Sequence, residues 1–96
     1  MARPRLIAIA AFNSEQDRIL GCYSTPYQAL AAILAAQFSP PADEQLFYEE
    51  PDNANPKMIQ VRFVMNREAH HLGRILVDRG NVDTILAELR NGKADG

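Results

Sequence analysis

The sequence predicts a single α+β domain, a two-layer sandwich in which an antiparallel four-stranded sheet carries helices on one face, in the order ββαββα(α). Three observations predict this class. Two short apolar runs lead directly into a helix-forming stretch, two further strand-like runs follow, and the periodicity then becomes helical. A chain of 96 residues can also bury one hydrophobic core without disulfides or metals. We assign residues 1–92 to this domain and expect residues 93–96 to form a flexible tail.

The first hairpin begins with Leu6–Phe12, which is apolar on both of its faces. Such a run is typical of an interior strand, or of a strand that a partner covers. Turn-forming residues separate it from the second strand, Ile19–Ser24. That strand contains Cys22, the only cysteine, which we expect to be buried. A single cysteine excludes an internal disulfide and fits a reducing compartment.

The stretch Thr25–Phe38 predicts the main helix. Thr25 is a suitable N-cap, Pro26 suits the first helical position, and Gln28 completes a capping box. One side carries an apolar stripe of Tyr27, Leu30, Leu34 and Phe38. The other side carries Ala29, Ala32, Ile33 and Ala36. A helix that is apolar nearly all round is usually buried, so we expect a second copy of the chain to cover this second side.

Two further strands are expected after the prolines at 40 and 41, which end the main helix. Glu44–Glu50 is the third strand, and its residues alternate in polarity only roughly. Met58–Met65 is the fourth and has the clearest alternation in the chain. Its inward row is Ile59, Val61, Phe63 and Met65, whereas Gln60 and Arg62 face outward.

Residues 67–79 are expected to form a helix, because Asn66 can cap it and apolar residues recur at helical spacing. The rival interpretation is a strand from Leu72 to Asp78. A final helix begins after the cap Asn81 and ends at Gly92. Its buried stripe is Val82, Ile85, Leu86 and Leu89.

The most asymmetric feature is an acidic segment without a basic residue between the prolines at 41 and 56. We predict that it docks a basic protein, through Glu44, Glu49, Glu50 and Asp52. Two other interpretations stay open. The charges can protect an edge strand from pairing with other chains, or they can form a solvated surface without a role.

An alternative function is weak binding of nucleic acid or another anion. If residues 67–79 are helical, Arg67, His71 and Arg74 share one face near Arg62, and guanidinium groups bind phosphate oxygens well. The net charge of −2 argues against a nucleic-acid partner, because the chain has no overall positive field.

No metal, cofactor or catalytic site is predicted. His70 and His71 are adjacent, so on a helix their rings point in different directions, and no metal-ligand or nucleophile motif is present. No run is long enough to span a membrane. We therefore predict a non-enzymatic protein-binding module, acting as an adaptor, regulator or inhibitor, which is cytoplasmic and forms a homodimer. A second alternative is a small enzyme of unknown reaction, using Cys22 or the histidines.

Overall fold

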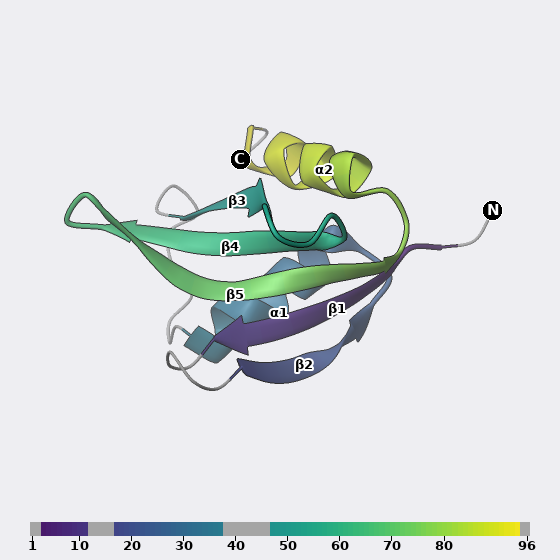
Figure 1. Cartoon of the computed structure of the whole chain (residues 1–96), viewed down its shortest axis with the longest axis horizontal. Helices are drawn as coiled ribbons and strands as arrows, with labels where there is room; N and C mark the ends of the chain where they lie inside the picture. The colour runs from purple at the N-terminus through teal and green to yellow at the C-terminus, as the bar shows by residue number, and fades with distance from the viewer. Residues whose placement is uncertain (1–2, 12–16, 38–46, 95–96) are drawn as a thin grey trace.

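The computed structural model describes residues 3–11, 17–37 and 47–94, which form five strands and two helices (Figure 1). In chain order they are β1 (Arg5–Ala11), β2 (Asp17–Tyr23), α1 (Pro26–Gln37), β3 (Phe47–Pro51), β4 (Met58–Met65), β5 (Glu68–Arg79) and α2 (Val82–Ala94). The α+β class is confirmed. Of the predicted third strand, residues 44–46 lie outside the described ranges.

The strands form one antiparallel sheet in the order β2-β1-β5-β4-β3. The prediction of four strands is wrong, because residues 67–79 contain the long central strand β5 instead of a helix. Ile75 and Val77 of β5 alternate into the core, and both are β-branched. The strand pairs with β1 on one edge and β4 on the other, and this pairing outweighs the local helix signals.

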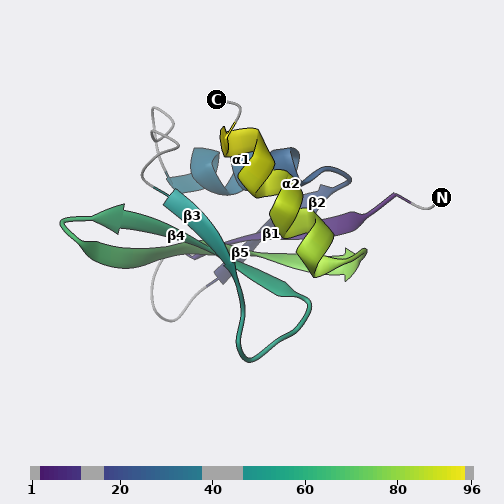
Figure 2. The same ribbon diagram turned by 90° about the horizontal axis from the view of Figure 1, so that it is seen from above.

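Both helices lie on the same face of the sheet (Figure 2). α1 packs over β1, β2 and β5, whereas α2 packs over β3 and β4. The core between the two layers is formed mainly by aliphatic side chains from both helices and from the strands, together with Phe47 of the edge strand β3. Its largest fully buried members are Leu6, Ile33, Ile59, Ile75, Leu89, Val61 and Val77. The inward positions Ile59 and Val61 of β4 are therefore as the alternation predicts.

Thr25 is the N-cap of α1, as predicted. The backbone N–H of Gln28 donates to Thr25 Oγ1 at 3.3 Å, and Pro26 is the first helical residue. The buried side differs from the predicted stripe, because it combines Ala29, Leu30, Ile33 and Leu34. Tyr27 is half exposed, and its hydroxyl donates to the carbonyl oxygen of Glu88 at 2.8 Å. This bond connects α1 with α2.

α2 begins as predicted. Asn81 Oδ1 accepts a hydrogen bond from the backbone N–H of Thr84 at 3.1 Å, and Ile85 belongs to the buried stripe together with Leu86 and Leu89. The expected stop at Gly92 is wrong, because the helix continues to Ala94. The first residues of the predicted tail are therefore helical, and residues 95–96 lie outside the described part.

Gly73 lies where β1, β5 and α1 meet. A Cβ atom added there would be 2.3 Å from the carbonyl oxygen of Ile9 and 3.0 Å from Cγ2 of Ile33. Real Cβ atoms do not approach backbone so closely, so only glycine allows this contact between helix and sheet. The pairing of β5 with β4 shifts beside it, between Val61 and Arg62. This irregularity places Leu72 and Gly73 consecutively in the interior.

Gln37 closes the same region from the end of α1. Its Nε2 donates to the carbonyl oxygens of Ala11 at 2.6 Å and of Leu72 at 2.9 Å. One side chain therefore satisfies acceptors at the end of β1 and at the irregular position of β5.

The turn between β4 and β5 consists of Asn66 and Arg67, whose φ angles are 55° and 65°. Two successive positive φ values are the geometry of a type I′ hairpin turn, in which glycine is favoured at the second position. Asn66 tolerates this conformation well, whereas a left-handed arginine is strained.

We expect the substitution Arg67→Gly to raise the free energy of unfolding by about 1 kcal/mol, because glycine adopts positive φ without a steric cost. Arg67→Ala is the matched control, since it removes the side chain and keeps the strained Cβ. Urea denaturation measures both variants. Equal effects of glycine and alanine would contradict backbone strain as the cause.

Candidate functional site

Among the described residues, no helix lies on the face of the sheet opposite α1 and α2 (Figure 2). We call this the open face. Side chains alternate between the two faces along each strand, so the neighbours of the core residues Leu6, Ile59 and Ile75 point to the open face. The open face therefore receives one side chain from every second position of the five strands.

Four apolar side chains lie side by side across the open face, and we call them the apolar row. They are Cys22 of β2, Ile7 of β1, Leu76 of β5 and Met58 of β4, each paired with the next. Cys22 is exposed, and the other three are half-buried. Ile9 and Ile19 form a second apolar pair beside the row, and Ile19 is 69% exposed. Apolar side chains thus cross four strands without a covering element in the described part of the chain.

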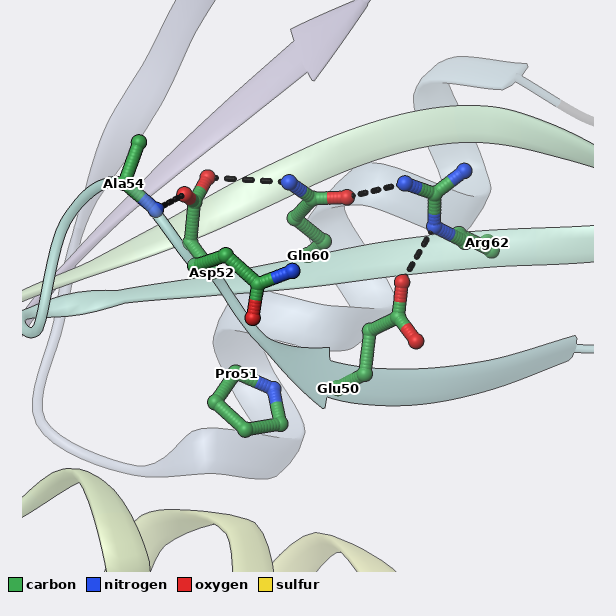
Figure 3. A pocket seen from close by; sticks show the side chains of 7 residues that line it. Glu50, Pro51, Asp52, Ala54, Gln60 and Arg62 are labelled. Carbon is green, nitrogen blue, oxygen red and sulfur yellow. Dashed lines mark hydrogen bonds and ion pairs between the residues drawn. The ribbon is translucent and has the colours of Figure 1, made fainter.

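The rest of the open face carries a chain of hydrogen bonds across β3 and β4 (Figure 3). Gln60 Nε2 donates to Asp52 Oδ2 at 2.9 Å, and Gln60 Oε1 accepts a hydrogen bond from Arg62. Arg62 Nε in turn donates to Glu50 Oε1 at 2.6 Å. The polar side chains on this part of the face are therefore bonded to one another within one copy.

A hollow of about 430 Å³ lies against this network. Its lining residues are Glu50, Pro51, Asp52, Asn53, Ala54, Gln60 and Arg62 (Figure 3). Asp52 also accepts hydrogen bonds from the backbone N–H groups of Ala54 and Asn55, at 2.7 Å and 3.2 Å. The hydrogen bond from Gln60 and those from the backbone lower the pKa of Asp52. Asp52 is therefore a structural carboxylate that shapes the loop before β4.

The pKa of His71 is lowered, first by partial burial and then by the positive charge of Arg62, while Asp52 acts in the opposite direction. The unfolded chain therefore takes up the proton of His71 at a higher pH than the folded chain does. The contribution to stability is present above pH 6.5, the ordinary value, and is lost as pH falls through the lower pKa of the folded state.

We expect the thermal midpoint of unfolding to fall between pH 7.5 and pH 5.5, and His71→Gln to reduce this fall. His70→Gln is the matched control, because His70 is exposed and lies next to His71 on the same strand. Calorimetry at the two pH values measures the difference. If the thermal midpoint of His71→Gln fell as much between the two pH values as that of the unsubstituted chain, groups other than His71 would cause the fall.

The predicted acidic docking surface is not assembled by the described residues. Glu49 is only 3% exposed and faces the helical layer, so it cannot take part in such a surface. Glu50 pairs with Arg62, and Asp52 is occupied by the loop and Gln60. Glu44 lies outside the described residues. The expected attraction of a basic protein to these carboxylates therefore loses its basis, because the described members are buried or already paired.

The residues predicted for self-association lie mainly in the core of one copy. Ala29 and Ile33 have no exposed surface, and Ala32 and Ala36 are half-buried. The expectation that a second copy covers this side is corrected, because α1 turns it toward the sheet. The exposed positions of α1 include Tyr27, Gln28, Ala31 and Ala35 instead.

The predicted anion-binding residues do not share one helical face, because the segment is a hairpin. Arg67 lies in the turn, whereas Arg62 and Arg74 are bound to Glu50 and Asp17. His71 is opposite Arg62 in the pairing of β4 with β5. These guanidinium groups are engaged by carboxylates of the same chain, which disfavours a phosphate site.

Cys22 is exposed, which corrects the expectation that it is buried. It lies level with Leu76 of β5, whereas His70 and His71 are farther along that strand toward the turn. Within residues 3–11, 17–37 and 47–94, no group of three or more histidine, cysteine or acidic side chains is placed to hold a metal ion.

Leu76 and Met58 are not predicted as site residues from the sequence, because Leu76 lies in the segment expected to be helical and Met58 lies at the edge of the alternating run. The signal that pointed to this face was the apolar character of β1 on both sides, through Ile7 and Ile9. Of the helices in the described ranges, none is long and apolar enough to cross a membrane. Comparison of the chain with known protein families, curated proteins and solved structures finds no significant match.

Proposed function

We propose that the chain is a small non-enzymatic protein-binding module, an adaptor, regulator or inhibitor, which docks its partner through the open face. The observation that carries the proposal is the apolar row, four adjacent side chains on a face that no described helix covers. Antiparallel sheets with one solvated face usually alternate between apolar inside and polar outside positions. Ile7, Leu76 and Met58 depart from that pattern, and contiguous exposed apolar surface is typical of interaction sites.

Two parts of the open face would contribute to partner binding in different ways. The apolar row supplies area that loses water on docking, which is the main favourable term in association. The hydrogen-bonded network of Gln60, Arg62 and Glu50 borders it and resembles the polar rim of an interface. A free thiol at Cys22 is consistent with the proposed cytoplasmic location, where thiols stay reduced.

The sole cysteine allows a direct test, because Cys22 can carry a maleimide-linked photo-crosslinker at one end of the apolar row. We expect irradiation in a lysate of the native host to give defined covalent adducts, and Met58→Lys in the same row to reduce them at least fivefold.

The matched control carries the label at Ala31→Cys in a Cys22→Ser background, because Ala31 is exposed on α1 and far from the open face. It should give no adducts of the same mass. Identical adducts from both positions, or none from Cys22, would remove the support for docking through the open face.

A further inference from the structure

The ion pairs on the open face indicate what kind of molecule can dock on it. Three arginines of the strands are each bound to an acidic side chain of the same copy. Arg5 Nε lies 3.4 Å from Asp78 Oδ2, Arg62 Nε lies 2.6 Å from Glu50 Oε1, and Arg74 contacts Asp17. On this face, three arginines are therefore matched by three carboxylates of the same copy, beside the apolar row.

Such a surface does not favour a strongly basic or strongly acidic protein, because the charges of these three ion pairs are neutralised within the chain. It also does not repel an identical surface, which like charges would otherwise do. A twofold contact requires the same patch on both copies to be self-complementary. An apolar row between balanced ion pairs meets this requirement.

We infer that the occupant of the open face is a second copy of this chain, stacked sheet to sheet about a twofold axis; this rests on the proposed function. In sheet order, Ile7 and Leu76 are the two central members of the apolar row. The axis therefore passes close to them, whichever way the second sheet is turned. Facing sheets pack about 10 Å apart, so both pairs of helices are outermost.

The size of the face places this contact at the small end of stable interfaces. Strands about 4.8 Å apart, with about seven residues each, give a five-stranded face of roughly 550 Å². Two faces then bury about 1,100 Å², slightly below the 1,200–2,000 Å² that is typical of stable interfaces. We therefore expect a reversible dimer with a dissociation constant on the order of micromolar.

Sedimentation equilibrium of the full chain between about 1 and 200 μM tests this inference across the expected micromolar range. The mass should rise from 10.7 kDa to twice that value. Met58→Lys should weaken the dimer at least tenfold, because it places a charge in the apolar row. Lysine can also extend to solvent along its aliphatic stem, which favours retention of the fold. Ala31→Lys, on the outer side of α1, should leave the dissociation constant unchanged.

A second measurement does not depend on weakening the contact. In a Cys22→Ser background, Leu76→Cys places a thiol near the proposed axis. Because facing sheets lie about 10 Å apart, beyond the reach of a disulfide, a bis-maleimide of about that span should link the two copies at concentrations where dimers form. Ala31→Cys in the same background, treated with the same cross-linker, should stay monomeric on denaturing electrophoresis. Far-UV circular dichroism confirms that each variant is folded.

The outcomes separate the two proposals. A chain that stays monomeric up to 200 μM, or a dimer that Met58→Lys does not weaken and Leu76→Cys does not link, overturns the second copy as occupant. If heterologous adducts at Cys22 are still found, and are lost in Met58→Lys, docking through the open face stands with another partner. If those adducts are also missing, both proposals fall.

Discussion

Replacement of Gly73 by alanine is expected to lower the free energy of unfolding by about 3–5 kcal/mol, the largest effect of a single methyl group in this chain. The added Cβ would lie 2.3 Å from the carbonyl oxygen of Ile9, a backbone atom in the middle of β1. Relief requires β1 or β5 to move, and either movement disturbs the packing of Ile33 from α1. Urea denaturation monitored by tyrosine fluorescence measures the loss.

Gly21→Ala is the matched control for this prediction. At that position the nearest atom to an added Cβ is the hydroxyl oxygen of Tyr23, 3.1 Å away at the end of a side chain that can turn aside. We expect a change within about 1 kcal/mol, since only a flexible group must move. A small effect at both glycines would show that the sheet adapts at Gly73 more easily than its close contact indicates.

Gln37→Met is expected to lower the free energy of unfolding by about 2 kcal/mol, the second largest effect. The change preserves the length of the side chain and removes both donated hydrogen bonds, which leaves the carbonyl oxygens of Ala11 and Leu72 without this donor. Partial exposure of the site keeps the loss below that of two fully buried acceptors. Thermal and chemical denaturation should agree on its size.

The same substitution at Gln28 provides the control, because Gln28 is exposed on α1 and its backbone, not its side chain, bonds to Thr25. Gln28→Met should change stability by less than about 0.5 kcal/mol. If both glutamines behave alike, the cost arises from helix composition and not from the two carbonyl contacts.

The elements that could be predicted from the sequence are those with clear local signals, such as capping residues and hydrophobic alternation. Thr25 and Pro26 mark the start of α1 by capping chemistry that acts locally, so it needs no knowledge of the rest of the fold. The alternation in β4 identified Ile59 and Val61 as inward residues for the same reason. These features depend on near neighbours in the chain, and local patterns report them well.

β5 was missed because its own irregularity hides the strand period. Leu72 and Gly73 are both buried in succession, so the alternation breaks and the remaining apolar positions fall at helical spacing. Asn66 strengthened the helix interpretation as an apparent cap, although its preference for positive φ serves the turn instead. Two residues between two strand-like runs were the unused signal of a hairpin.

The candidate site was only partly predictable. The two-sided apolar character of β1 indicated an uncovered surface, but the partner strands of Ile7 depend on the order of the sheet. Glu49 is placed among acids in sequence, yet it follows the buried Phe47 by two residues and therefore faces the same way, toward α2. Whether a charged position is outside or inside therefore depended on where a distant helix packs.

The place of β1 beside β5 has a consequence for synthesis of the chain. Of the five described strands, β1 is synthesised first and must wait for β5, which is synthesised last, since β1 and β4 meet only through β5. Until Arg79 has emerged, the nascent polypeptide can form two separate hairpins whose inner edges are open to other chains. Contacts between such distant segments also slow folding. Translation speed through the codons of β5, and chaperone supply at that moment, should therefore govern how much newly made protein reaches the native state.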